Sequence, residues 1–321
     1  MKRTDLGLSE GVEECWMEFD GARMRYLRTS PPFDGLRAGI LAEEARNRAP
    51  KPALVLLHGL MGYSFSWRFT MPALAPYATV YAPDMLGAGF SDRPKIDHSM
   101  RATARRVLRF AENLGLESFD LLGTSRGGAV AMCAAAEIAD RRDADGRDLS
   151  VRRLVLVAPV NPYSAHGRWL APMAGSRAGS AIVRQVMEKL PGLYPYWHGR
   201  MFGDPSKIPA GSLEGYKEPL KTPGLFEHAL SIVSTWTRDL QELEALLPKL
   251  ESIPTLLMWG SDDPAVYFSS MEPLARHFAN VQTVTFPHVG HLPYEECPEE
   301  FNRALIGFLT SASSRGGKAI S

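Results

Sequence analysis

The chain has 321 residues, of which 45% are hydrophobic and 22% are charged, a composition that is ordinary for a globular protein. Lysine plus arginine and aspartate plus glutamate both number 36, so no net positive charge attracts nucleic acid or an anionic membrane. The sequence also has no run of about 18 apolar residues that could span a bilayer. We therefore expect no nucleic-acid partner and no membrane insertion.

Three scattered cysteines, Cys15, Cys133 and Cys297, are too few for a disulfide framework and too dispersed for a zinc site. The first ten residues contain no apolar stretch of the kind found in secretory signals. Both observations favour a reducing compartment, so we expect a cytoplasmic location.

The first predicted element is a β-hairpin. Glu14–Phe19 and Arg23–Leu27 flank Asp20-Gly21, and Asp-Gly between two extended runs favours a tight hairpin turn. Residues 30–52 follow as a polar segment that begins and ends near prolines. We expect this segment to be a surface excursion.

Short apolar runs alternating with helix-like segments make up most of the remaining chain. Continuous apolarity indicates strands that are buried on both faces, as in a parallel sheet. The sequence therefore predicts an α/β fold with a mostly parallel central sheet and helices on both faces. The expected strands are Ala53–Leu57, Ala78–Tyr81, Phe119–Leu122, Leu154–Val157, Thr255–Trp259 and Val281–Phe286. The expected helices are Phe69–Pro76, Ser99–Leu114, Gly127–Ile138, Met271–Phe278 and Pro298–Leu309.

Residues 160–250 interrupt this alternation because they contain no convincing strand. They are typical of helices separated by Pro and Gly, over Ile182–Leu190, Leu225–Thr237 and Leu240–Leu250. Such a segment is too long for a plain crossover loop. We expect a helical cap at 160–250, on a discontinuous core formed by 1–159 and 251–321, with a disordered tail at 311–321.

The segment Gly123-Thr124-Ser125-Arg126-Gly127 is the strongest chemical signal in the chain. It lies between a predicted strand and a predicted helix, which is the setting of a nucleophile elbow. Small flanking residues permit a sharp turn, and the helix amides favour negative charge beside Ser125. The alternative interpretation is a glycine-rich helix start with Ser125 as its cap.

A serine nucleophile requires a base that is oriented by a third group, and both partners are expected later in the chain. Asp262 and Asp263 follow one predicted strand, and His288 and His291 follow the next. Polar groups at the carboxyl ends of parallel strands gather at one edge of the sheet. Each residue also has a simpler interpretation, as a turn former or a solvated histidine.

An oxyanion hole would need two backbone N–H groups directed at the developing charge. One is expected from Arg126, directly after the nucleophile, and one from the loop His58–Gly62, where Leu60 is the best candidate. The glycines on both sides of Leu60 allow a close approach of this loop. The alternative is a loop whose glycines only turn the chain.

Together these motifs resemble the α/β-hydrolase superfamily over residues 14–310. The resemblance rests on His58-Gly59, the segment from Pro83 to Pro94, the elbow at Ser125, the segment from Trp259 to Asp263 and the segment from Gly290 to Pro298. It implies Asp263 as the acid, His291 as the base and a cap at 160–250. It also implies a structural role for the Asp84–Pro94 stretch, with Asp92 bonded to nearby amides.

The resemblance also argues against some activities. Haloalkane dehalogenases and epoxide hydrolases use an aspartate nucleophile, whereas this chain has Ser125. Hydrolases of meta-cleavage products often have Trp after the catalytic His, whereas Leu292 follows here. Proline iminopeptidases usually have Trp after the nucleophile, whereas Arg126 follows here.

We therefore expect a serine hydrolase that cleaves small to medium carboxylic esters through an acyl-enzyme, with Ser125, Asp263 and His291 as the catalytic triad. The expected partner is a small-molecule ester, no metal or other cofactor is expected, and the protein is expected to be a monomer or homodimer. The alternatives are a C–C bond hydrolase, a thioesterase, a cofactor-free haloperoxidase or a non-catalytic ligand-binding protein.

Aromatic and other apolar residues of the cap are candidates for the substrate pocket. Residues at such spacings also commonly belong to a core. The candidates are Trp169, Met173, Trp197, Phe202 and Trp236. The histidines of the insertion, His166, His198 and His228, do not follow a strand, so none is expected to be the base.

Overall fold

The computed structural model describes residues 9–19, 21–29, 51–145, 149–164, 179, 185 and 193–311. Most of the predicted surface excursion at 30–52 lies outside the described residues. The same holds for nearly all of the predicted helix Ile182–Leu190 and of the predicted tail.

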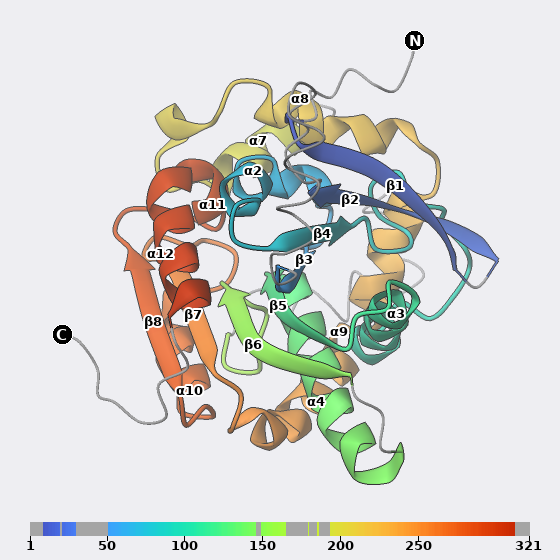
Figure 1. Cartoon of the computed structure of the whole chain (residues 1–321). Helices are drawn as coiled ribbons and strands as arrows, with labels where there is room; N and C mark the ends of the chain where they lie inside the picture. Colours follow the sequence, from blue (N-terminus) through green and yellow to red (C-terminus); the bar gives the residue numbers. More distant parts are fainter. Residues whose placement is uncertain are drawn as a thin grey trace, which may run out of the picture.

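A mixed, mostly parallel sheet forms the centre of the molecule (Figure 1). Its described strands are β1 (Val12–Phe19), β2 (Ala22–Thr29), β3 (Ala53–Leu57), β4 (Thr79–Pro83), β5 (Ser118–Thr124), β6 (Ser150–Val157), β7 (Thr255–Gly260) and β8 (Val281–Phe286), in the order β1-β2-β4-β3-β5-β6-β7-β8. The hairpin β1–β2 and the pair β2–β4 are antiparallel, and the other pairs are parallel. The predicted fold class is therefore confirmed.

Helices cover both faces of the sheet. The described α-helices are α2 (Thr70–Leu74), α3 (Met100–Asn113), α4 (Arg126–Asp145), α7 (Leu193–Arg200), α8 (Ser212–Lys217), α9 (Leu225–Leu246), α10 (Met271–Ala275), α11 (Pro293–Glu296) and α12 (Pro298–Thr310). The predicted division between Leu225–Thr237 and Leu240–Leu250 is wrong, because α9 continues through it. The segment has neither Gly nor Pro to end the helix, and Arg238 pairs with Glu242 one turn later.

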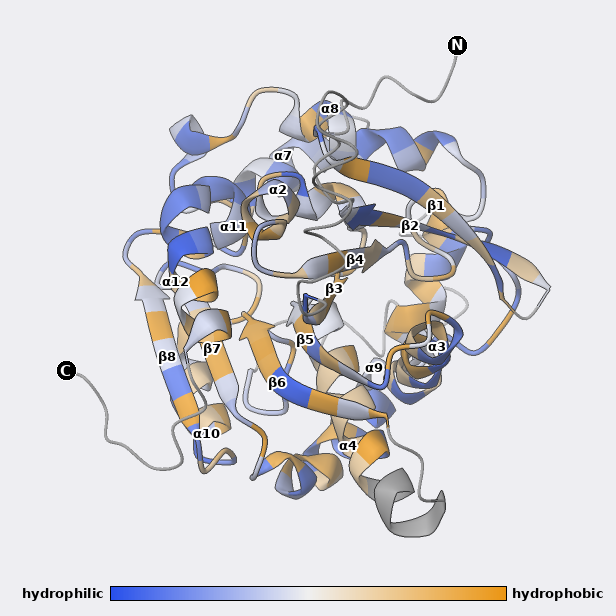
Figure 2. Cartoon of the chain, in the orientation of Figure 1, coloured by the Kyte–Doolittle hydropathy of each residue, from blue (hydrophilic) through white to orange (hydrophobic). Residues whose placement is uncertain are grey.

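Two apolar clusters fill the spaces above and below the sheet. Successive residues of a strand point to opposite faces, so Leu54 and Leu56 belong to one cluster and Val55 and Leu57 to the other. In Figure 2 hydrophobic colours dominate the parts of β6 and β7 nearest the middle of the molecule. Burial on both faces explains why the strands appear in the sequence as continuous apolar runs.

Between β6 and β7, the described residues 160–164 and 193–254 contain no strand, and the regular elements there are helices. Part of this insertion nevertheless belongs to the core, because Leu240, Leu243 and Leu246 of α9 join the cluster that contains α4. The domain boundaries at 160 and 250 stay a prediction. Within the described ranges, no helix is both long and apolar enough to cross a membrane.

The order of the strands determines where loops can form a site. After β3 the chain proceeds to β4 on one side, whereas β5 lies on the other side of β3. The loops after β3 and β5 therefore diverge at their carboxyl ends. In open α/β sheets this position is where ligands bind.

Helix α4 begins in close contact with the end of β3. A Cβ atom built on Gly127 would lie 2.4 Å from the carbonyl oxygen of His58 and 2.5 Å from that of Leu57. Both neighbours are backbone atoms, which cannot move aside as the end of a flexible side chain can. Gly127 therefore permits the contact between the loop after β3 and the turn after β5.

Replacing Gly127 with alanine is expected to lower the free energy of unfolding by about 2–3 kcal/mol, because overpacking displaces backbone. Gly307→Ala is the matched control, since a Cβ on Gly307 in α12 meets nothing within 4 Å. That change should leave stability unchanged or raise it by up to about 1 kcal/mol. Urea unfolding measures both, and equal stabilities of the two variants would contradict the steric argument.

Candidate active site

Ser125 lies in the turn between β5 and α4 with a φ of 51°, in the left-handed region that residues with a side chain seldom adopt. Hydrogen bonds from β6 and the loop after it hold this conformation. The N–H of Ser125 donates to Val157 O at 2.9 Å, and its carbonyl accepts from Val160 N at 2.9 Å. Hydrogen bonds from outside the turn therefore hold Ser125 in this conformation. A strained residue persists only when the surrounding structure holds it in this way.

The loop after β3 lies directly against this serine. A Cβ atom on Gly59 would lie 3.1 Å from the Cβ atom of Ser125, closer than side-chain atoms normally approach. His58 supports the loop, because its Nε2 accepts from Met85 N at 3.0 Å and its Nδ1 lies 2.9 Å from Gly59 O. Burial lowers the pKa of His58, so its neutral imidazole is a structural link between two loops.

His291 and Asp263 form a buried acid–base pair. Nδ1 of His291 lies 2.7 Å from Oδ2 of Asp263. The other carboxylate oxygen, Oδ1, accepts from Ala265 N at 2.7 Å and Val266 N at 2.9 Å. A carboxylate that accepts at Nδ1 leaves Nε2 of the neutral imidazole as a proton acceptor.

The alternative residues Asp262 and His288 have different surroundings. The His288 ring is exposed, and its Nδ1 lies 3.6 Å from Oδ2 of Asp262 at the surface. Asp262 also accepts from the hydroxyl of Ser261 at 2.6 Å. An exposed ion pair of this kind contributes little to stability.

Ser125 and His291 line the same cavity, whose volume is about 290 Å³. This volume lies near the lower end of small-molecule sites, roughly 300–1,000 Å³. The cavity is lined by Gly59, Leu60, Met61, Gly62, Ser66, Ser125, Tyr194, Trp197, His198, Met201, Tyr216, His291, Leu292 and Tyr294. The side chains of Ser125 and His291, which both lie in the described part of the chain, form no hydrogen bond with each other. Catalytic hydrogen bonds are commonly unformed before substrate binds.

The candidate oxyanion donors are the backbone amides of Leu60 and Arg126. Arg126 is the first residue of α4, so its N–H has no acceptor within the helix. Within the described part of the chain, neither amide donates to another protein group. The amide of Arg126 also lies at the positive end of the helix dipole.

The aromatic candidates for the pocket are found in different places. Trp197 lines the cavity. Phe202 is buried and lines a separate groove with Asp262, and Trp236 packs partly buried against the core. Trp169, like Met173, lies outside the described residues.

Several cavity residues were not predicted from the sequence. They include Tyr194, His198 and Tyr216 of the insertion, together with Ser66 and Tyr294. Tyr194 and His198 share α7 with Trp197, so the spacing of polar and aromatic residues on this helix was the available signal.

A buried polar network joins the insertion to the core beside the cavity. Arg68 forms a two-pronged pair with Glu295, with both N–O distances at 2.8 Å. The same carboxylate accepts from the hydroxyls of Ser212 and Tyr216 on α8. Burial and the nearby Glu295 raise the pKa of Tyr216 well above its usual value. Its hydroxyl therefore acts as a donor that ties α8 to α11.

Glu296 holds the loop that carries His291. Its Oε2 accepts from Gly290 N at 2.8 Å and Gly203 N at 3.0 Å, and its Oε1 accepts from Asp204 N at 2.8 Å. The N–H of His291 itself donates to Met201 O at 2.7 Å. The histidine loop is thus bonded directly to the segment after α7.

The stretch Asp84–Pro94 has the expected structural role. Oδ2 of Asp92 accepts from Arg23 N at 2.8 Å, which confirms that Asp92 bonds a nearby amide. The buried Asp84 accepts from Ser64 N and Phe90 N, and it pairs with Arg25 at 3.1 Å. These bonds fix the loop after β4 against the β1–β2 hairpin.

The described ranges contain no group of three or more His, Cys, Asp or Glu side chains that could hold a metal ion. Cys15, Cys133 and Cys297 are all free thiols.

Comparison with known proteins agrees with the α/β fold. Haloalkane dehalogenase 2 of Mycobacterium tuberculosis is 28% identical over 274 residues, covering 79% of this chain and 87% of that protein. Human monoacylglycerol lipase ABHD6 is 26% identical over 270 residues, covering 81% and 76%. The crystal structure of Cfl2 from Burkholderia cenocepacia superposes with a TM-score of 0.75 at 21% identity, covering 95% and 98%. A model of the alpha/beta hydrolase family matches residues 54–304, so the chain belongs to this family.

Proposed function

We propose that the protein hydrolyses small to medium carboxylic esters through an acyl-enzyme on Ser125. The observation that carries this proposal is the shared cavity, which brings a strained serine and an aspartate-linked histidine to one space. In this mechanism, Oγ of Ser125 attacks the ester carbonyl, and Nε2 of His291 accepts its proton. The imidazolium then donates that proton to the leaving alkoxide.

The remaining groups act on the charges that develop. Asp263 keeps Nδ1 of His291 protonated and stabilises the imidazolium. The amides of Leu60 and Arg126 donate to the carbonyl oxygen as it becomes negative. Water then attacks the acyl-enzyme with His291 as base, which releases the acid and restores Ser125.

The chemistry of serine favours an ester over a haloalkane. If Ser125 displaced a halide, the product on the enzyme would be an alkyl ether. An ether has no carbonyl carbon for water to attack, so the enzyme would stop after one turnover. An ester instead leaves an acyl group that water can remove.

The walls of the cavity support a substrate with apolar parts. Leu60, Trp197, Met201 and Leu292 supply apolar surface around Ser125. Apolar walls with a few placed polar groups are typical of small-molecule sites. Among the relatives, ABHD6 is named as a lipase of monoacylglycerols, which agrees with an ester substrate.

A fluorophosphonate probe is expected to label the folded protein once, with the adduct on the peptide that contains Ser125. Ser125→Ala should abolish labelling, and it should lower turnover of p-nitrophenyl esters about 10⁴-fold or more. Adding His291→Ala should reduce turnover little further, because the residues act as one unit. Intact-mass spectrometry measures the adduct, and a folded wild-type protein that remains unlabelled would overturn the proposal.

Asp263→Asn is expected to lower kcat by about 10⁴-fold, because an amide cannot hold the correct imidazole tautomer. Asp262→Asn is the matched control and should change kcat less than about threefold, since Asp262 lies at the surface. Steady-state kinetics with one activated ester compares them. The assignment of the acid is wrong if the larger loss follows Asp262→Asn.

Glu296→Gln is expected to weaken the histidine loop, because the two carboxylate oxygens now accept from three N–H groups and glutamine has only one acceptor oxygen. The free energy of unfolding should fall by about 1–3 kcal/mol, and kcat should fall by up to about 10²-fold with KM nearly unchanged. Glu299→Gln, at an exposed position of α12, is the control. An unchanged kcat for Glu296→Gln would show that the loop keeps its place without this carboxylate.

A further inference from the structure

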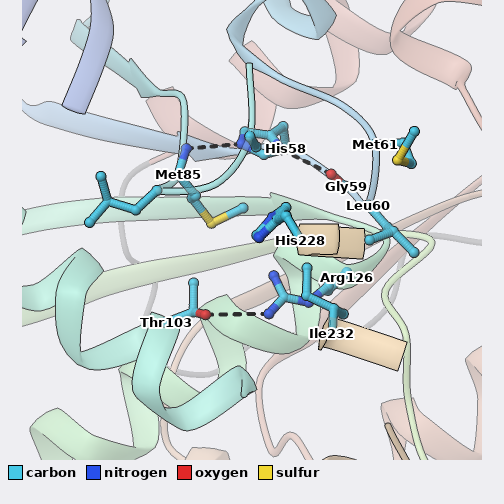
Figure 3. Close-up of a pocket in the computed structure, with 11 residues that line it drawn as sticks. His58, Gly59, Leu60, Met61, Met85, Thr103, Arg126, His228 and Ile232 are labelled. Atoms are coloured by element: carbon cyan, nitrogen blue, oxygen red, sulfur yellow. Dashed lines mark hydrogen bonds between the residues drawn. The ribbon is translucent and has the colours of Figure 1, made fainter. Parts of the chain in front are cut away.

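A second, smaller pocket is also lined by the loop Gly59–Met61 (Figure 3). It has room for about one water-sized atom. Its lining includes the loop itself, the side chains of Thr103 and Arg126, and His228 and Ile232 of α9. Figure 3 shows His228 and Arg126 together at this pocket. The two pockets therefore share one loop, and Ser125 lines only the larger of them.

The Arg126 guanidinium in this pocket is a buried cation with an unused donor. The residue is 3% exposed. One terminal nitrogen donates to the carbonyl of His98 and lies 3.3 Å from Oγ1 of Thr103, but Nε has no partner in the described structure. Burial lowers the pKa of Arg126 to about 10, which still leaves it charged at neutral pH. A buried charge normally has a counter-ion.

No carboxylate of the described chain serves as that counter-ion through direct contact. Asp239 is the acidic residue that most raises the pKa of Arg126. Its Oδ2 is already used by Met100 N at 3.1 Å and Thr235 Oγ1 at 2.9 Å, and the pair makes no salt bridge. The charge of Arg126 is thus only partly compensated.

The other polar groups of the pocket add donors without adding charge. Nδ1 of His228 is also buried without a partner, and its ring packs edge-on against His98 with centroids 4.3 Å apart. Burial lowers the pKa of His98 to about 4 and that of His228 to about 2, so both are neutral. Helix α4 begins at Arg126, which adds the positive end of its dipole.

We propose that this pocket binds a small anion, whose negative atom accepts from Nε of Arg126 and from Nδ1 of His228. A space of one atom excludes phosphate and sulfate, but it accepts a halide ion or one oxygen of a carboxylate. A carboxylate in this pocket would belong to an acidic ester whose ester carbonyl lies at Ser125, so this possibility rests on the proposed function. The halide source is independent of that function.

The first experiment measures thermal unfolding of the full chain in sodium chloride, bromide and gluconate at equal ionic strength. Chloride and bromide are expected to raise the midpoint over gluconate in a saturable manner, by about 2 °C or more. Arg126→Met should lose this difference. Arg105→Gln, which removes the same charge from an exposed pair with Glu137, should keep it.

The second experiment measures kcat/KM for p-nitrophenyl esters of equal chain length that end in a carboxylate or a methyl group. The acidic ester is expected to be preferred about tenfold or more, and Arg126→Met should lower this ratio by a similar factor. The ratio of the two esters is compared because the Arg126 amide is itself a candidate oxyanion donor. A substitution that displaced this amide would lower the rates of both esters and leave their ratio unchanged. Arg126→Lys, which keeps the charge without Nε, should give an intermediate ratio.

Together, the two experiments distinguish a free anion from a substrate carboxylate, and they test the anion pocket separately from the proposed function. A halide effect without an acidic-ester preference assigns the pocket to a free anion, and the reverse result assigns it to the substrate. If no ester is hydrolysed but halides stabilise the wild type through Arg126, the proposed function fails and the anion pocket stands. If neither halide stabilisation nor ester preference depends on Arg126, the proposal is overturned.

Discussion

The site depends on the close approach of three backbone segments at one edge of the sheet. The loop after β3 touches Ser125 through Gly59, and the start of α4 touches the end of β3 through Gly127. The third segment, the end of β6 with the loop after it, bonds both backbone polar groups of Ser125. A residue in a sparsely populated conformation costs about 1–3 kcal/mol, so the surrounding contacts must over-determine it. The sheet supplies these contacts because all three segments leave the carboxyl ends of adjacent parallel strands.

The position of the candidate base depends on the insertion as well as on the sheet. His291 is oriented by Asp263 from the loop after β7, but its own N–H bonds to Met201. Glu296 then joins the same loop to Gly203 and Asp204. The segment after α7 is therefore a support of the histidine, and it cannot swing open independently of it.

The sequence predicted those features that depend on neighbours along the chain. The strands and the turn at Ser125 follow from local apolar runs and small residues. The local pattern left Asp262 or Asp263 and His288 or His291 as candidates, and only the resemblance to α/β hydrolases favoured Asp263 and His291. The cavity walls depend on distant pairs, such as Tyr216 with Ser66 and Arg68 with Glu295, which no periodicity reveals. Residue type alone also does not locate a side chain. Trp236 was an aromatic candidate for the pocket, but it packs on the core. The continuity of α9 has a local cause, because the helix contains no Gly or Pro between Leu225 and Leu246.

Arg126 has its backbone beside Ser125 and its side chain at the smaller pocket, so under both proposals this one residue would link recognition to chemistry. Its amide directly follows Ser125 and is a candidate oxyanion donor, whereas its guanidinium lies at the smaller pocket that Leu60 also lines. In a low-dielectric interior, a charge at the smaller pocket acts strongly on a charge beside Ser125, because only a few atoms of Arg126 lie between them. An acidic substrate would neutralise the guanidinium as it binds, whereas a neutral substrate would leave a buried donor unpaired. Discrimination then arises from the penalty on the wrong ligand as well as from attraction to the right one.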